Sequence, residues 1–161
     1  MAGGRRGDQR QRLLDAPLQL PGAVITHPFG EDVHVYKVGV ATAGAASSPT
    51  PSTFPAGRHA GGKMFAILGL SAEPGLLTLK VEPDHGIVLV ARHDAITPGY
   101  HTNKRHWISV LLDGSVPDDV VRELIEDSYD LVLHTLTARA RFEVDPDRFP
   151  LPGTHRPGPD A

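Results

Sequence analysis

The stretch KMFAILGLSAEPGLLTLKVEP, residues 63–83, decides the fold class of this chain. It contains two apolar runs of strand length, 63–71 and 75–83, on either side of a Pro-Gly turn signal. Strands joined by so short a link pair in antiparallel fashion. The sequence therefore predicts a β-hairpin here and an antiparallel sheet around it.

Further strands are expected on both sides of this hairpin. Residues 32–40, DVHVYKVGV, alternate apolar and polar side chains, and residues 106–114, HWISVLLDG, form another β-type run that ends in an Asp-Gly turn. Residues 84–96 leave two interpretations open. Their Ile-Val-Leu-Val centre favours a strand, whereas Asp84 as a helix N-cap favours a short helix.

The strongest helical pattern covers residues 116–136, VPDDVVRELIEDSYDLVLHTL. Ser115 with Asp118 matches a capping pattern at its start. One stripe at helical spacing should cover a face of the sheet, and it consists of Val121, Leu124, Ile125, Ser128, Leu131, Val132 and Leu136. An opening helix is expected within 9–20, shortened or kinked by Pro17.

These elements predict an α+β two-layer sandwich, in which a mostly antiparallel sheet packs against helices in the approximate order α-β-β-β-α-β-β-α. A single domain should span residues 8–137. Residues 41–61 are Ala, Gly, Ser, Thr or Pro at 18 of 21 positions, so they are expected to form a disordered loop insertion. Residues 138–161, with five prolines, are expected to form a Pro-rich tail that adds nothing to the core.

Composition and charge exclude several classes of protein. The chain has no cysteine, which excludes disulfides, thiolate zinc sites and cysteine nucleophiles. No apolar stretch is long enough for a membrane helix and the N-terminus lacks a secretory signal, so a cytoplasmic protein without a membrane partner is expected. The net charge is −3, and residues 16–137 carry −5. Any nucleic-acid binding must therefore rest on a local basic patch.

Basic residues on different predicted strands are candidates for such a patch. Lys37, Lys63 and Lys80 fall on three of these strands, and Lys104 with Arg105 leads into a fourth. If the strands align these side chains, they form a positive stripe across one face or end of the sheet that binds phosphate or carboxylate groups. The alternative is that each lysine is an exposed strand residue that hinders edge pairing.

The cluster TPGYHTNKRHWISV, residues 97–110, also has two interpretations. In the first, its basic pair contacts phosphates, His101 and Asn103 form hydrogen bonds, and Tyr100 or Trp107 stacks on a base. In the second, which is favoured for Trp107, the rings anchor the core while His101 and Asn103 satisfy a turn.

Catalytic and metal sites find little support in the sequence. No Gly-x-Ser-x-Gly elbow, P-loop or Gly-x-Gly-x-x-Gly fingerprint is present, so no catalytic residue, cofactor or enzyme activity is expected. Several possible ligands do lie within 23 positions, namely Asp84, His85, His93, Asp94, His101 and His106. Their spacing matches no tight metal motif, so a metal-dependent activity of these histidines is only a minor alternative.

Several short segments resemble the MmcQ/YjbR family in their order and spacing. They are LPGA at 20–23, PFG at 28–30, VYKVG at 35–39, GKMFA at 62–66, LTLK at 77–80, TPGYHTNKRHW at 97–107 and ELIEDSYDLV at 123–132. The resemblance covers about residues 13–133. It implies a CyaY-like or secretion-chaperone-like fold, with helices packed on a mostly antiparallel sheet, and DNA binding through strand pairs that project like wings.

The sequence thus leads to two functional hypotheses. The first is binding of an anionic partner, DNA by family resemblance, through Lys37, Lys63, Lys80, His101, Asn103, Lys104 and Arg105. The second is a protein-binding adaptor or chaperone-like module that uses its sheet face, which tolerates an acidic core. The sequence indicates no oligomeric state.

Overall fold

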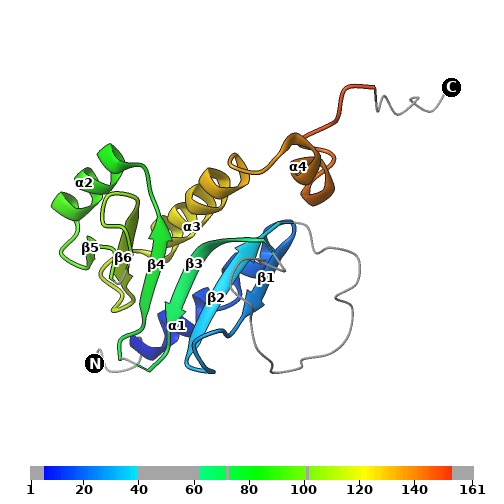
Figure 1. Cartoon of the computed structure of the whole chain (residues 1–161). Coiled ribbons are helices and arrows are strands. Elements are labelled where there is room, and N and C mark those ends of the chain that lie inside the picture. The colour runs from blue at the N-terminus through cyan, green and yellow to red at the C-terminus, as the bar shows by residue number, and fades with distance from the viewer. Residues whose placement is uncertain (1–5, 40–61, 72, 101, 154–161) are drawn as a thin grey trace, which may run out of the picture.

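The α+β fold class is confirmed by a computed structural model, which describes residues 6–39, 62–71, 73–100 and 102–153 (Figure 1). Its strands form one six-stranded antiparallel sheet in the order β1-β2-β3-β4-β6-β5. The strands are β1 (Ala23–Thr26), β2 (Val33–Val38), β3 (Lys63–Gly69), β4 (Leu76–Lys80), β5 (Ile96–Pro98) and β6 (Trp107–Leu111). The helices are α1 (Arg6–Leu13), the 3-10 turn η1 (Ala16–Gln19), α2 (Pro83–Arg92), α3 (Asp118–Leu133) and α4 (Ala138–Val144).

The predicted hairpin at 63–83 is confirmed as β3 and β4, which pair from Ala66–Leu79 to Gly69–Leu76. For residues 84–96 the helix alternative is correct, because α2 (Pro83–Arg92) contains the Ile-Val-Leu-Val centre, although its N-cap is Glu82 and not Asp84. The next strand, β5, begins only at Ile96. The opening helix is short, as expected, but α1 begins at Arg6 and ends at Leu13, and Pro17 lies in the separate turn η1. Strand β1 was not predicted, because four residues are too few to show a clear alternation.

The hydrophobic core lies between one face of the sheet and the helices. Helix α3 runs across this face (Figure 1), and it buries Val121, Leu124, Ile125, Ser128, Tyr129, Val132 and Leu133. Alternate strand residues such as Tyr36, Leu79 and Ile108 point into the same core. The opposite side of the sheet is covered by no helix of the described residues, and we call it the helix-free face.

Ser128 completes the hydrogen bonding of the sheet from within α3. Its hydroxyl accepts a hydrogen bond from Lys80 N at 2.8 Å and donates one to Phe65 O at 2.5 Å. These two backbone groups lie just beyond Ala66–Leu79, the last pair between β3 and β4. A helix side chain therefore supplies partners that the neighbouring strands no longer give each other.

The start of α3 is held differently from the prediction. Ser115 does not cap the helix, because its hydroxyl and backbone N–H both bond to Asp113. The carboxylate of Asp118 instead accepts hydrogen bonds from Arg12 at 2.6 Å and from the buried Gln9 at 2.9 Å. The bond from Arg12 holds the pKa of Asp118 below its ordinary value. The predicted cap is therefore wrong, because side chains of α1, and not Ser115, form the hydrogen bonds at the start of α3.

Part of the expected C-terminal tail is ordered and packed. Thr137 caps α4 by accepting a hydrogen bond from Ala140 N, and Val144 and Phe149 pack against the core. Arg148 forms an ion pair with Asp130 of α3 at 2.8 Å. The proline count obscured this helix because the prolines follow it. Residues 41–61 and 154–161 lie outside the described residues.

Candidate nucleic-acid interface

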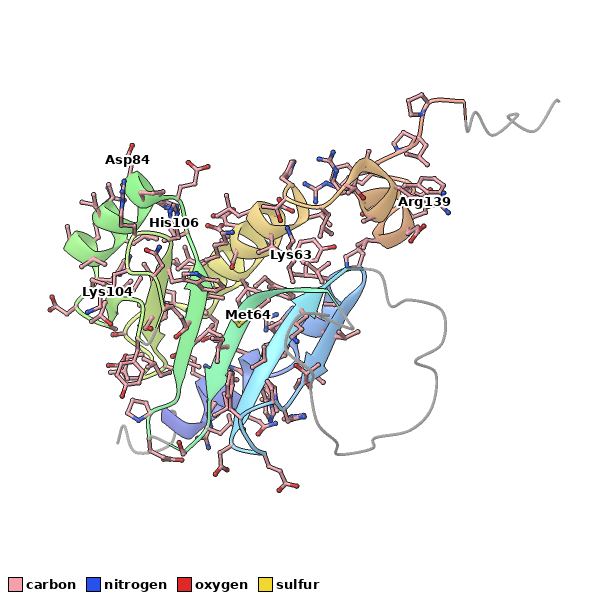
Figure 2. All side chains as sticks on the ribbon, viewed as in Figure 1. Lys63, Met64, Asp84, Lys104, His106 and Arg139 are labelled. Atoms are coloured by element: carbon pink, nitrogen blue, oxygen red, sulfur yellow. The ribbon has the colours of Figure 1, made fainter. Side chains whose placement is uncertain are left out.

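Residues from four strands form one row across the sheet. Lys37 of β2 pairs with Met64 of β3, and Lys80 of β4 pairs with Trp107 of β6. Because β3 and β4 are neighbours in the sheet, these two pairs adjoin at the end where β2 and β4 finish. Figure 2 labels Met64 at this end of β3. We call Lys37, Met64, Lys80 and Trp107 the cross-strand row.

The cross-strand row points to the helix-free face. Successive side chains of a strand point to opposite sides, and Tyr36, Leu79 and Ile108, which are adjacent in sequence to row residues, lie in the core. Trp107 is partly exposed and lies outside the core cluster. The favoured interpretation of Trp107 as a core anchor was therefore wrong. The size of the indole ring suggested burial, but the alternation of side chains along β6 decides which face of the sheet Trp107 occupies.

The charge of the strands is of one sign. The six strands contain Lys37, Lys63 and Lys80 but no Asp or Glu. This contrasts with the net charge of −3 for the whole chain. The carboxylates of the described residues thus lie on helices and loops, so a phosphate group on the sheet would meet lysines without an adjacent acidic strand residue.

Lys63 is separated from the other two strand lysines. It lies at the same end of the sheet, but it pairs with the core residue Val38 and its Nζ bonds to Thr135 Oγ1 at 3.0 Å and Thr135 O at 3.3 Å. A cation at this position complements the carbonyl end of α3. Lys63 thus fastens β3 to the helix layer, while Lys37 and Lys80 lie on the helix-free face.

The loop between β5 and β6 adds further cations beside Trp107. Lys104 and Arg105 are exposed there, and Figure 2 labels Lys104 near His106. Asn103 shapes the turn: its side chain accepts a hydrogen bond from Arg105 N and its carbonyl accepts one from His106 N, both at 3.0 Å. The turn interpretation of Asn103 is confirmed. His101 lies outside the described residues.

This loop is held tightly on β6. Gly99 N donates to Trp107 O at 2.8 Å, and Tyr100 N donates to the buried hydroxyl of Ser109 at 3.0 Å. A Cβ atom at Gly99 would lie 2.1 Å from Thr102 Oγ1 and 2.7 Å from Trp107 Cβ. Only glycine fits such an approach. The loop therefore places Tyr100, which is 64% exposed, close to the row.

Another concave site of the described residues is less suited to an anion. A cleft of about 480 Å³ lies between α2 and α3, and Lys80 lines it together with Glu82, Asp127 and Asp130, so carboxylates outnumber the lysine there. Within the described ranges, no three His, Asp or Glu side chains converge as metal ligands. None of the helices in these ranges has the length and apolar content needed to cross a bilayer.

Comparison with known proteins assigns the chain to a family. A family model described as YjbR matches residues 18–131. The chain belongs to the YjbR family. This match includes the whole cross-strand row and the β5–β6 loop, whereas α4 lies beyond it.

Relatives and solved structures of YjbR-like proteins agree with this assignment. The chain is 30% identical over 129 residues to "Uncharacterized protein YbdF" of Escherichia coli O157:H7, which covers 80% of this chain and 88% of that protein. "Uncharacterized protein YyaQ" of Bacillus subtilis is 39% identical over 66 residues, 40% of this chain and 55% of that protein. The crystal structure of Deinococcus radiodurans protein DR2400 matches with a TM-score of 0.67 and 33% identity, covering 83% of this chain and 86% of that one.

The sequence identified the cations of this candidate site but not how the strands arrange them. Met64 was not singled out, because its partner Lys37 lies on the far side of residues 40–61 and the register between β2 and β3 cannot be read across them. The alternation of Trp107 with the buried Ile108 was the signal that could have placed the tryptophan on the helix-free face.

Proposed function

We propose that this YjbR-family protein binds DNA through the helix-free face and that it acts by binding, not by catalysis. The observation that supports the proposal is the charge of the sheet, whose strands hold three lysines and no carboxylate in an acidic chain. Two of these lysines, Lys37 and Lys80, face the same side, and Lys104 and Arg105 extend the cations along the β5–β6 loop. Phosphate contacts supply most of the sequence-independent affinity for DNA.

The number of cations sets the expected salt dependence. Four phosphate contacts give a log-log salt slope of about −3.6 for duplex DNA and about −2.8 for a single strand. Affinity should then fall roughly 50- to 150-fold between about 50 and 200 mM salt. Four phosphate contacts give only a modest affinity, which salt weakens further, so binding should be measured at low salt.

Fluorescence anisotropy with a labelled oligonucleotide tests the proposal at about 50 mM salt. The double variant Lys37→Ala/Lys80→Ala should weaken binding at least about tenfold and reduce the salt slope by about half, because it removes two of the four contacts. The matched control is Lys63→Ala/Arg139→Ala, which also removes two positive charges but none from the helix-free face. Absence of saturable binding, or equal weakening by both double variants, would contradict the proposal.

A protein partner is the second candidate, because the helix-free face is also apolar. Val24 is 43% exposed there, and Met64 and Ile67 are partly exposed. Affinity purification of the intact chain followed by mass spectrometry distinguishes the candidates. A stoichiometric protein with no nucleic acid in the eluate would favour the adaptor function, whereas nuclease-sensitive material would favour DNA.

A further inference from the structure

Aromatic rings accompany the cations on the helix-free face. Trp107 lies directly opposite Lys80 on the neighbouring strand, and Tyr100 begins the loop that carries Lys104 and Arg105. Building on the proposed function, we infer that the ligand is single-stranded nucleic acid, whose bases stack on Trp107 and Tyr100 while its phosphates contact the neighbouring cations.

The two aromatic residues are held in place before any ligand arrives. Ser109 lies two residues after Trp107 on the same face, and its buried hydroxyl accepts the hydrogen bond from Tyr100 N. That hydroxyl is itself fixed at 2.9 Å from the hydroxyl of Thr78 on β4. Tyr100 therefore starts from an anchored backbone, which reduces the entropy lost when a base stacks on its ring.

Cationic and apolar side chains alternate along the cross-strand row, and they match the phosphates and bases of a single nucleic-acid strand. Lys37 and Lys80 are cations, and Met64 and Trp107 are apolar. Neighbouring strands lie about 4.8 Å apart, so Lys37 and Lys80, two strands apart, are separated by about 10 Å across the sheet. A single strand exposes both phosphates and unstacked bases, and it can satisfy both kinds of side chain. A duplex keeps its base faces stacked inside and leaves the apolar members of the row without a partner.

The shape of the face also disfavours a duplex. Sequence reading in the major groove requires a helix or a two-stranded ribbon that enters it. No helix of the described residues lies on this face, and the row runs across four strands of a six-stranded sheet and not along a two-stranded ribbon. The four cations contact phosphates of a duplex and of a single strand alike. Stacking on the two rings adds affinity that only a single strand can gain, and this applies to DNA and RNA strands alike.

The test uses the full chain with three labelled ligands of one sequence: single-stranded DNA, single-stranded RNA and the DNA duplex. We expect the tighter single strand to bind at least about tenfold more strongly than the duplex, and the DNA and RNA arms identify which source it prefers. Trp107 is the only tryptophan, so single strands should also quench the intrinsic fluorescence.

Substitution of the rings separates stacking from charge. Trp107→Leu and Tyr100→Leu should each lower single-strand affinity about 5- to 150-fold, the range for loss of one base stack, while leaving the salt slope unchanged. Tyr100 is exposed, so its variant keeps the test valid if Trp107→Leu unfolds the chain. The control is Phe29→Leu, since Phe29 is 71% exposed in the turn between β1 and β2, away from the loop.

The outcomes distinguish this inference from the function on which it rests. Duplex binding as tight as single-strand binding, with the lysine dependence intact, would overturn the inference and leave the proposed function standing. Single-strand binding that is indifferent to both ring substitutions would overturn it as well. Absence of binding to all three ligands would overturn the inference and the proposed function together.

Discussion

The hydroxyl of Ser128 satisfies two backbone groups that no strand reaches. It accepts from Lys80 N and donates to Phe65 O, and the residue is fully buried. Lys80 belongs to the cross-strand row, so α3 controls the position of this part of the helix-free face from the opposite side of the sheet. Sequence periodicity correctly placed Ser128 in the buried stripe, but it gave no reason for a polar residue there.

Replacing Ser128 by alanine should therefore destabilise the protein. The substitution leaves a buried N–H and a buried carbonyl without partners, and each unsatisfied group costs about 1–3 kcal/mol. We expect the free energy of unfolding in urea to fall by at least about 2 kcal/mol with an unchanged m-value. Ser115→Ala, at an exposed serine, should change it by less than about 0.5 kcal/mol. Equal effects of the two substitutions would contradict this account of Ser128.

The N-terminal segment is attached to the core by two tyrosine hydroxyls. Tyr36 donates to Leu14 O at 2.7 Å, and Tyr129 donates to Pro21 O at 2.6 Å. Burial raises the pKa of both side chains, that of Tyr129 to about 12. Both phenols are thus kept protonated, so each can donate to a carbonyl that follows an N-terminal helical turn.

Among the elements, α4 closes the end of the sheet where β1 begins. Val144 contacts the position of Gly22, where an added Cβ atom would lie 3.0 Å from Val144 Cγ1. Gly22 also has a φ of +67°, a conformation that costs other residues roughly 1–2 kcal/mol. This packing could not be read from the sequence, because more than a hundred residues separate Gly22 from Val144 and no periodicity links them.

Gly22→Ala measures how closely α4 is packed. We expect a loss of about 2 kcal/mol of unfolding free energy, from the backbone conformation and from the contact with Val144. In a double-mutant cycle with Val144→Ala, the contact part should disappear, so that Gly22→Ala costs at least about 0.5 kcal/mol less in the second background. Strict additivity of the two changes would show that α4 does not pack on Gly22 in solution.

Element prediction succeeded where the signal was local. The hairpin of β3 and β4 followed from one turn between two apolar runs, and α3 followed from its stripe. The candidate site depends on strand pairing between segments that are distant in the sequence. No local pattern predicts such pairing. Whether Lys63 shares a face with Lys37 is decided by the register of β2 against β3, which contains an irregularity between Tyr36 and Lys37.

At the scale of the whole molecule, one core joins every strand to the helices. Buried residues from β2, β3, β4, β5, β6 and α3 form a single cluster. Residues 138–153 add Val144 and Phe149 to its edge, and Phe149 in turn lies within 5.5 Å of the guanidinium carbon of Arg141. The described part of the chain thus contains no second core that could unfold separately.

A single core predicts a single unfolding transition. Trp107 reports on the helix-free face of the sheet, while far-UV circular dichroism reports mainly on the helices. In urea the two signals should give coincident midpoints, as for other two-state domains of about 150 residues. Loss of the tryptophan signal at a distinctly lower urea concentration would show that β6 and its loop unfold before the helix layer.

Formation of the cross-strand row depends on folding of the whole sheet. Its members are spread from residue 37 to residue 107 and come together only through strand pairing. The surface that they form therefore does not exist in the unfolded chain. A single-stranded nucleic acid bound along the row would contact β2, β3, β4 and β6 at once and would hold these four β-strands together. Occupancy would then resist separation of the strands, and a ligand at 100 times its Kd would add about 2.7 kcal/mol to the stability of the fold.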